Sequence, residues 1–248
     1  MKNETGINEV KYAPAGDQGV VMQFGNAISE STNMRIRAMV EQVNNNPIYG
    51  VTELVPTFAS LLVLYDQSKT NYKKVCKALC SREMKCKEMK NTKQKIHLIP
   101  VCYEQEYGED LDQVAEHAKI TTEEVIKLHS ERDYLIYMLG FLPGFVYLGG
   151  MNEKIFCPRL ATPRTQIPAG SVGIGGEQTG IYPLASPGGW RLIGRTPVRV
   201  YDPEREPSIL YKMGEYIRFV PINNKEYGEI ERDCKASTYK HQVQEKSI

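Results

Sequence analysis

Several features that would assign a function class directly are scarce or missing in this sequence. Its 248 residues carry a formal net charge of only +1, which argues against a basic surface for nucleic acid and against an acidic tail. Its apolar runs, such as Leu61–Tyr65, are far shorter than the roughly 20 residues that a membrane-spanning helix needs. The first residues lack the apolar run of a signal peptide. We therefore expect a cytoplasmic protein that binds neither nucleic acid nor membranes.

Sequence patterns for metal binding and for familiar catalytic sites are also lacking. Six cysteines are present without a CxxC pair, and only Cys76, Cys80 and Cys86 are closely spaced. Cys76 and Cys80 would lie one turn apart on a helix, which suits neither a zinc knuckle nor an unstrained disulfide. Neither an HExxH motif nor a GxSxG motif occurs. We expect reduced thiols and no metal site.

The first part of the chain has the pattern of an α+β domain. The expected strands are Val20–Phe24, Val51–Val55 and Ser60–Tyr65, and the expected helices begin at Ser29 and at about Asn71. With a further strand at Ile96–Val101, this order is the split βαβ pattern of a ferredoxin-like unit. The polar run Lys85–Lys95 is typical of a solvated linker. We therefore predict one domain over residues 1–93 and a second over residues 94–248.

Glycine, proline and short strand patterns dominate the second part of the chain. Two short helices, the second capped by Thr121, precede a strand that ends at Gly140. The short strands expected after Gly140 include Ile181–Leu184, Trp190–Gly194, Val198–Asp202 and Tyr216–Ile222. Many short strands with dense turn residues predict a closed or partly closed β-barrel.

Lysine is missing from residues 155–211, where arginine supplies the positive charge. Up to Val200 this segment contains a single acidic residue, Glu177. The planar guanidinium suits carboxylate or phosphate, and it tolerates partial burial better than an ammonium group does. Two interpretations stay open: the arginines bridge strand ends through backbone carbonyls, or they form an anion pocket. The pocket would consist of Arg159, Arg164, Arg191 and Arg195.

The glycine-rich run Pro168–Gly180 fulfils neither familiar nucleotide pattern. A Walker motif needs Lys-Ser/Thr after its last glycine, where Ile181 and Tyr182 stand. A dinucleotide site needs a helix at that point, and the sequence IYPLASPGG cannot form one. The glycines either serve tight turns, or their backbone N–H groups form a nest for an anion.

Two single residues in this part of the chain also have alternative interpretations. His129 ends a predicted helix, where it either caps the last carbonyl groups or faces a pocket as an acid or base. Trp190, the only tryptophan, either contacts a ligand or plugs the barrel.

Three long runs extend these observations. They are GFLPGFVYLGG (Gly140–Gly150), PRLATPRTQIPAGSVGIGGEQTGIYP (Pro158–Pro183) and SPGGWRLIGRTP (Ser186–Pro197). They resemble the signature blocks of the KipI/PxpB family, also called allophanate hydrolase subunit 1, and the resemblance runs in order from about residue 12 to residue 222. It implies an N-terminal ferredoxin-like domain followed by a cyclophilin-like β-barrel. Two local departures are YEQE at Tyr103–Glu106, where the family usually has YGGE, and Gly214-Glu215 in place of a GD turn.

The family resemblance implies one of two functions. Most members resemble the B subunit of bacterial 5-oxoprolinase, which acts with the A and C subunits to open 5-oxo-L-proline to L-glutamate with hydrolysis of ATP. Other members inhibit a sporulation sensor histidine kinase, and the signature blocks do not separate the two. We favour the enzyme subunit, inactive alone; its close partner would be the C subunit, and the A subunit would be a further one. ATP, with Mg²⁺, would then act at the level of the complex, with no cofactor tightly bound to this chain.

Under this interpretation, the candidate site residues lie mostly in the glycine- and arginine-rich part. The candidate catalytic residues are His129 and Glu177. The candidates for binding substrate or phosphate are Arg159, Arg164, Gln166, Gln178, Trp190, Arg191 and Arg195. The remaining groups would come from the other subunits. An Arg164→Ala variant is expected to abolish the activity of the complex and to leave the thermal midpoint within a few degrees.

Overall fold

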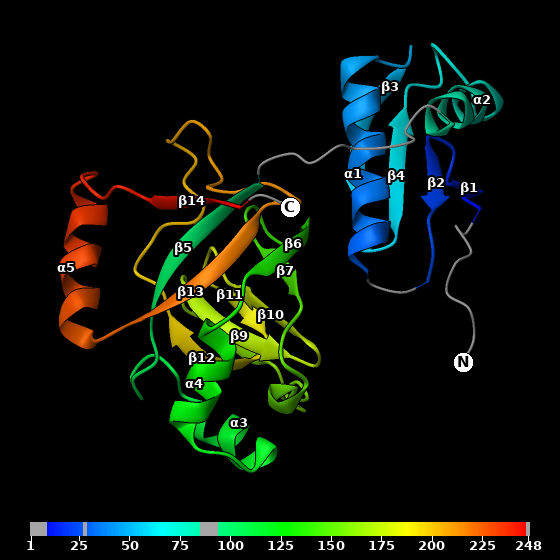
Figure 1. Cartoon of the computed structure of the whole chain (residues 1–248). Coiled ribbons are helices and arrows are strands. Elements are labelled where there is room, and N and C mark those ends of the chain that lie inside the picture. Colours follow the sequence, from blue (N-terminus) through cyan, green and yellow to red (C-terminus); the bar gives the residue numbers. More distant parts are fainter. Residues whose placement is uncertain (1–8, 27–28, 85–93, 247–248) are drawn as a thin grey trace. The chain divides into compact units, whose positions relative to one another are not determined.

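The computed structural model describes residues 9–26, 29–84 and 94–246. The chain divides into two compact units, Met1–Thr92 and Lys93–Ile248, and Figure 1 shows the elements of both. The first eight residues, Cys86 and most of the predicted linker Lys85–Lys95 lie outside the described residues. Within the described ranges, no helix is both long enough and apolar enough to cross a membrane.

The first unit is a four-stranded antiparallel sheet with two helices. Its elements are β1 (Lys11–Ala15), β2 (Gly19–Gln23), α1 (Glu30–Asn45), β3 (Val51–Pro56), β4 (Ser60–Tyr65) and α2 (Tyr72–Glu83). The strand order is β1-β2-β4-β3. Every second residue of β4 is buried, and the apolar faces of both helices are buried as well. Both predicted helix starts are confirmed, since the side chains of Ser29 and Asn71 accept hydrogen bonds from N–H groups of the first turn.

The ferredoxin-like prediction is confirmed, with one correction to its strand assignment. The sequence pattern places the fourth strand after α2, at Ile96–Val101. In the structure β1 takes that place and pairs antiparallel with β2, whereas residues 96–101 belong to the second unit. Pro14 lies within β1, which is an edge strand, the position where a sheet tolerates proline.

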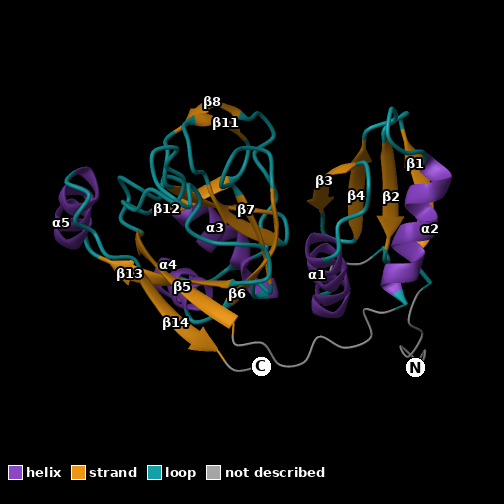
Figure 2. Cartoon of the chain, turned by 90° about the horizontal axis from the view of Figure 1, so that it is seen from above, coloured by secondary structure: helices purple, strands orange, loops and turns teal. Residues whose placement is uncertain are grey.

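The second unit is a closed barrel of mixed strands with helices around it (Figure 2). Its elements are β5 (Gln94–Cys102), α3 (Leu111–Ala118), α4 (Thr122–Ser130), β6 (Tyr134–Leu139), β7 (Val146–Gly149), a 3₁₀ turn (Glu153–Ile155), β8 (Arg164–Ile167), β9 (Ser171–Gly175), β10 (Gln178–Ile181), β11 (Ser186–Gly188), β12 (Arg191–Arg195), β13 (Tyr216–Ile222), α5 (Asn224–Lys235) and β14 (Gln242–Lys246). The barrel order is β12-β9-β10-β7-β6-β13-β5, and the pairing of Arg195 with Cys102 closes it. The predicted barrel is therefore confirmed.

Strands β5 and β13 pair in parallel within the barrel. Strand β14 and the β8–β11 ribbon are not part of the closed barrel. β14 pairs with the first half of β5, and β8 pairs with β11 as a separate ribbon at the edge of the unit (Figure 2). The predicted strand over Val198–Asp202 is wrong, because the structure has only a single bridge there, between Tyr201 and Ile209. The barrel interior is filled by inward-facing apolar side chains from all sides, among them those of Ile136, Leu148 and Ile174.

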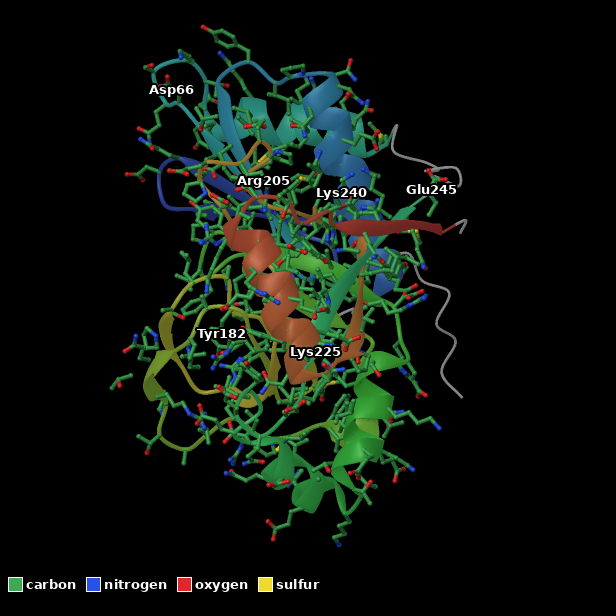
Figure 3. All side chains as sticks on the ribbon, turned by 90° about the vertical axis from the view of Figure 1, so that its left-hand side faces the viewer. Asp66, Tyr182, Arg205, Lys225, Lys240 and Glu245 are labelled. Atoms are coloured by element: carbon green, nitrogen blue, oxygen red, sulfur yellow. The ribbon has the colours of Figure 1, made fainter. Side chains whose placement is uncertain are left out.

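One arginine of the lysine-free segment has a purely structural environment. Arg205, labelled in Figure 3, lies between β12 and β13. Its guanidinium group donates to the backbone carbonyl oxygens of Arg199, Val200, Pro207 and Ser208. The interpretation that arginines bridge strand ends through carbonyl groups therefore holds for Arg205.

Candidate functional site

Trp190 covers a patch of barrel wall that is made of glycine. Gly173 and Gly175 of β9 and Gly180 of β10 alternate with residues that face the barrel interior. A Cβ atom added at Gly175 would lie 2.4 Å from Nε1 of Trp190, and one added at Gly180 would lie 3.0 Å from its Cζ3. Trp190 itself is only 5% exposed. The glycines at these positions therefore make room for the indole ring.

Aromatic rings surround Trp190 on the outside of the barrel. Phe145 lies 5.5 Å from Trp190 and 5.1 Å from Tyr182 between ring centroids, both edge-to-face. Tyr147 of β7 completes the group at 6.2 Å from Trp190. We call Phe145, Tyr147, Tyr182 and Trp190 the aromatic cluster. It is separate from the core inside the barrel, and it was not predicted.

Arg159 lies over the aromatic cluster. Its guanidinium carbon is 5.8 Å from the Trp190 ring centroid, a cation–π distance. Arg159 is exposed, and it forms no salt bridge with the described residues. The structure therefore brings two of the predicted residues together, one buried and one with its charge available to an anion.

The tip of the β9–β10 hairpin lies beside the segment that carries Arg159. Cys157 and Gly176 exchange both backbone hydrogen bonds, with N···O distances of 3.2 and 2.8 Å. Glu177 follows Gly176 and is exposed, and Gln178 at the start of β10 is half-buried. Arg159, Glu177 and Gln178 thus come from neighbouring backbone segments.

Arg164 on β8 is neutralised within its own unit. Its Nη2 lies 2.8 Å from Oδ1 of Asp110 and 3.4 Å from Oε2 of Glu109. Asp110 is 1% exposed, and its Oδ2 accepts a hydrogen bond of 2.7 Å from the backbone N–H of Leu192. The hydrogen bond to Asp110 raises the pKa of Arg164. Arg164 is therefore the counter-charge of a buried carboxylate. Gln166 lies two residues further along β8 and is exposed.

Arg191 and Arg195 lie at opposite ends of β12. Arg191 donates to the carbonyl oxygen of Pro158 and to Oε1 of Gln113. The Arg195 guanidinium lies over the ring of Tyr107, 5.4 Å from its centroid. The four residue steps from Arg191 to Arg195 place their Cα atoms about 13 Å apart along the strand. The predicted arrangement of four arginines in one pocket is therefore not what the structure shows.

His129 is a core residue of the barrel. It is fully buried, its Nδ1 lies 2.8 Å from the Tyr103 hydroxyl, and its Nε2 lies 2.8 Å from Oγ1 of Thr179. The Thr179 hydroxyl donates its proton to the carbonyl oxygen of Gly173. Nε2 of His129 must therefore be the protonated nitrogen, and Nδ1 accepts the Tyr103 proton.

This environment corrects both expectations for His129. Its ring nitrogens bind neither the helix carbonyls nor any group at a surface. Burial lowers the pKa of His129 to about 3, which keeps the ring neutral over the physiological range. A neutral imidazole with both nitrogens engaged has a structural role, because proton exchange with a substrate would require breaking a buried hydrogen bond.

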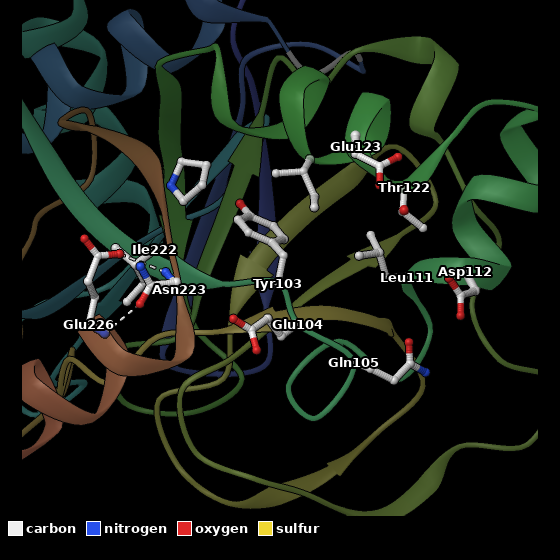
Figure 4. A pocket seen from close by; sticks show the side chains of 12 residues that line it. Tyr103, Glu104, Gln105, Leu111, Asp112, Thr122, Glu123, Ile222, Asn223 and Glu226 are labelled. Carbon is white, nitrogen blue, oxygen red and sulfur yellow. Dashed lines mark hydrogen bonds between the residues drawn. The ribbon is translucent and has the colours of Figure 1, made fainter.

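The structure has a pocket elsewhere on the second unit (Figure 4). It has a volume of about 600 Å³, and none of the predicted site residues lines it. Its four carboxylates belong to Glu104, Asp112, Glu123 and Glu226. Glu104 and Glu226 accept hydrogen bonds from backbone N–H groups at the start of α5. These two acids therefore cap α5, and the charge of the four carboxylates makes the pocket unsuited to an anionic substrate.

Among the described residues, no group of three or more histidine, cysteine, aspartate or glutamate side chains is placed to hold a metal ion. Arg159, which is exposed and lies over the aromatic cluster, is the best candidate for binding an anion. Sequence reasoning missed two features, the aromatic cluster below Arg159 and the buried partner of Arg164. The first had a signal in the aromatic density of GFLPGFVY.

Comparisons with known proteins agree with this fold. The model of a family described as carboxyltransferase domain, subdomain C and D, matches residues 10–211. The chain is 40% identical over 223 residues to the 5-oxoprolinase B subunit of Bacillus subtilis (strain 168), a match that covers 86% of this chain and 92% of the relative. The chain belongs to the family of 5-oxoprolinase B subunits.

A second member of this family, the 5-oxoprolinase B subunit of Escherichia coli O157:H7, is 37% identical over 206 residues, which is 83% of this chain and 93% of the relative. Among solved structures, the urea carboxylase of Kluyveromyces lactis superposes with a TM-score of 0.81 at 24% identity. That match covers 96% of this chain and 24% of the urea carboxylase chain. The α+β fold of the 5-oxoprolinase B subunits is therefore also found within a longer protein.

Proposed function

We propose that this chain is the B subunit of an ATP-dependent 5-oxoprolinase, which opens 5-oxo-L-proline to L-glutamate together with the A and C subunits. The observation that carries the proposal is the 40% identity to the B. subtilis protein over nearly the full length of both chains. The name of that relative makes it one subunit of an assembly, so the chain acts within a complex.

The chemistry of the reaction explains why arginine is needed. The lactam amide is a poor electrophile, and its opening is coupled to the hydrolysis of ATP, which acts with Mg²⁺ at the level of the complex. The substrate carboxylate and the transferred phosphoryl group both require cationic groups and oriented N–H donors. This chain has arginines but no nucleotide motif, so the A and C subunits provide the remaining groups.

Arg159 is the strongest candidate for the substrate anion. It is exposed, free of any salt bridge with the described residues, and held over Trp190. Arg191 is the second candidate, because its partners are the neutral oxygens of Pro158 and Gln113. Arg164 is less suited, because Asp110 already neutralises it.

The test is 5-oxoproline-dependent ATP hydrolysis by the purified chain, alone and with the A and C subunits. We expect no activity alone and activity in the full mixture. An Arg159→Ala variant should lower kcat/KM of the complex about 100-fold, the scale for losing one preorganised donor. Arg232→Ala, at an exposed arginine of α5, is the matched control and should not change it. Activity from the isolated chain, or none in the mixture, would contradict the proposal.

A further inference from the structure

Hydrogen bonds fix the backbone on both sides of Arg159. Before it, the carbonyl oxygen of Pro158 accepts a hydrogen bond of 3.3 Å from the guanidinium group at the start of β12. After it, the N–H of Leu160 donates to the carbonyl oxygen of Gly189 at 2.7 Å. Because Leu160 and Gly189 are bonded to each other, Arg159 and Trp190 project from adjoining positions of two joined segments.

The contact between Arg159 and Trp190 differs from the contacts of the other arginines nearby. Arg164 is neutralised by Asp110, and Arg205 uses its N–H donors on backbone carbonyl groups. The side chain of Arg159 makes neither a hydrogen bond nor a salt bridge with the described residues. A cation–π contact orients a guanidinium group without neutralising its charge and without using its N–H donors. Of these three arginines, Arg159 alone keeps its charge and its donors for an anion.

Trp190 is itself held firmly by the barrel wall. Its ring lies against Gly175 and Gly180, and Phe145 packs on it edge-to-face at 5.5 Å between centroids. Only 5% of Trp190 is exposed, so its ring offers almost no surface to a ligand. A free arginine side chain loses rotamer freedom when it binds an anion, and one that already rests on a fixed ring loses less. The indole ring can therefore contribute to binding without touching the ligand.

We propose that Trp190 is a positioning residue, which holds Arg159 where its guanidinium group binds the carboxylate of 5-oxo-L-proline. This inference rests on the proposed function. The fork of a guanidinium group matches a carboxylate through two parallel N–H···O bonds. The carboxylate takes no part in the opening of the lactam bond, so its binding is equal in the ground state and in the transition state. Loss of the ring should therefore raise KM for 5-oxoproline and leave kcat and KM for ATP unchanged.

The test is a double-mutant cycle, measured as 5-oxoproline-dependent ATP hydrolysis by the complex with the A and C subunits. Trp190→Leu removes the aromatic face and should raise KM for 5-oxoproline about 10-fold, within the range of a cation–π contact. Trp190→Phe keeps a ring beneath the guanidinium group and should raise KM less than about 3-fold. In an Arg159→Ala background, Trp190→Leu should change KM by less than about 2-fold, because the ring acts only through Arg159.

Ile167→Ala is the matched control for packing. Ile167 is fully buried in the same apolar cluster as Trp190, so its truncation lowers stability without removing the ring beneath Arg159. Its KM for 5-oxoproline should equal that of the wild type. An equal rise in KM for Ile167→Ala, an unchanged KM for Trp190→Leu, or losses that add in the double variant would overturn the inference.

A fluorescence measurement does not depend on the folding of the Trp190 variants. In the purified chain, Arg159→Ala should shift the emission of Trp190, the only tryptophan, to longer wavelength, because water then reaches the ring that the guanidinium group covers. Arg232→Ala should leave the emission unchanged, and an unshifted emission in Arg159→Ala would contradict the contact. A wild-type mixture without 5-oxoproline-dependent activity would refute the proposed function and this inference together. Wild-type activity with additive losses would refute only the positioning role of Trp190.

Discussion

Acidification should destabilise the barrel through His129. In the folded chain this ring is fully buried, and its pKa is lowered to about 3 from an ordinary value of 6.5. As the pH falls below about 6.5, the unfolded chain gains a proton that the folded chain does not bind. Stability from this group is therefore fully present above pH 6.5 and is lost progressively down to about pH 3.

The size of the effect follows from the two pKa values. Between pH 7 and pH 5 nearly the whole unfolded population becomes protonated at this position, while the folded ring stays neutral. Linkage then gives a loss of about 2 kcal/mol in the free energy of unfolding. This is a large part of the roughly 5–15 kcal/mol by which domains are stable. His241, whose pKa burial lowers to about 4, adds a change of the same sign.

Comparison with a variant isolates the contribution of His129. His129→Gln should be less stable at pH 7, but it should lose about 2 kcal/mol less than the wild type between pH 7 and pH 5. His241 is present in both proteins, so its contribution cancels when their pH dependences are compared. Urea unfolding can be followed through the fluorescence of Trp190, which is the only tryptophan and lies in the same barrel.

The control is His117→Gln, at an exposed histidine of α3, which should keep the pH dependence of the wild type. If the wild type and His129→Gln lose the same free energy of unfolding between pH 7 and pH 5, the reasoning is refuted. That result would mean that the buried ring binds its proton as readily as it does in the unfolded chain.

Two further predictions concern the candidate site. Gly175→Ala should displace Trp190, destabilise the barrel by about 1–3 kcal/mol and change the tryptophan emission. The control Gly228→Ala, at a position on α5 with open space around it, should be neutral or stabilising. Thermal unfolding and fluorescence would check both variants, and unchanged stability and emission in Gly175→Ala would refute the packing of Trp190 against Gly175. Arg164→Ala should lower the thermal midpoint by several degrees, because Asp110 is left buried without its counter-charge. A midpoint equal to that of the wild type would favour the surface role that the sequence pattern predicts for Arg164.

Local patterns were sufficient for most elements of the first unit. The helix starts at Ser29 and Asn71 and the strands β3 and β4 follow from caps and alternation, which act over a few residues. Strand β1 was missed because it carries a proline and few apolar residues, and only its place at the sheet edge accommodates it. Helix α5 was also missed, although the Asn223–Glu226 capping box at its start is a readable signal.

The sequence by itself determined the fold class and the family, since both depend on patterns that are local or that recur in order along the chain. The roles of the single polar residues were decided only by the tertiary structure. Arg164 meets Asp110 across 54 positions, and His129 meets Thr179 across 50, distances that no local pattern encodes. Likewise, the need for glycine at positions in β9 and β10 becomes apparent only in the structure, where the Trp190 ring packs against them. The sequence specifies the charge and chemistry of each side chain, but its burial and its partners depend on packing between segments that are far apart in the chain.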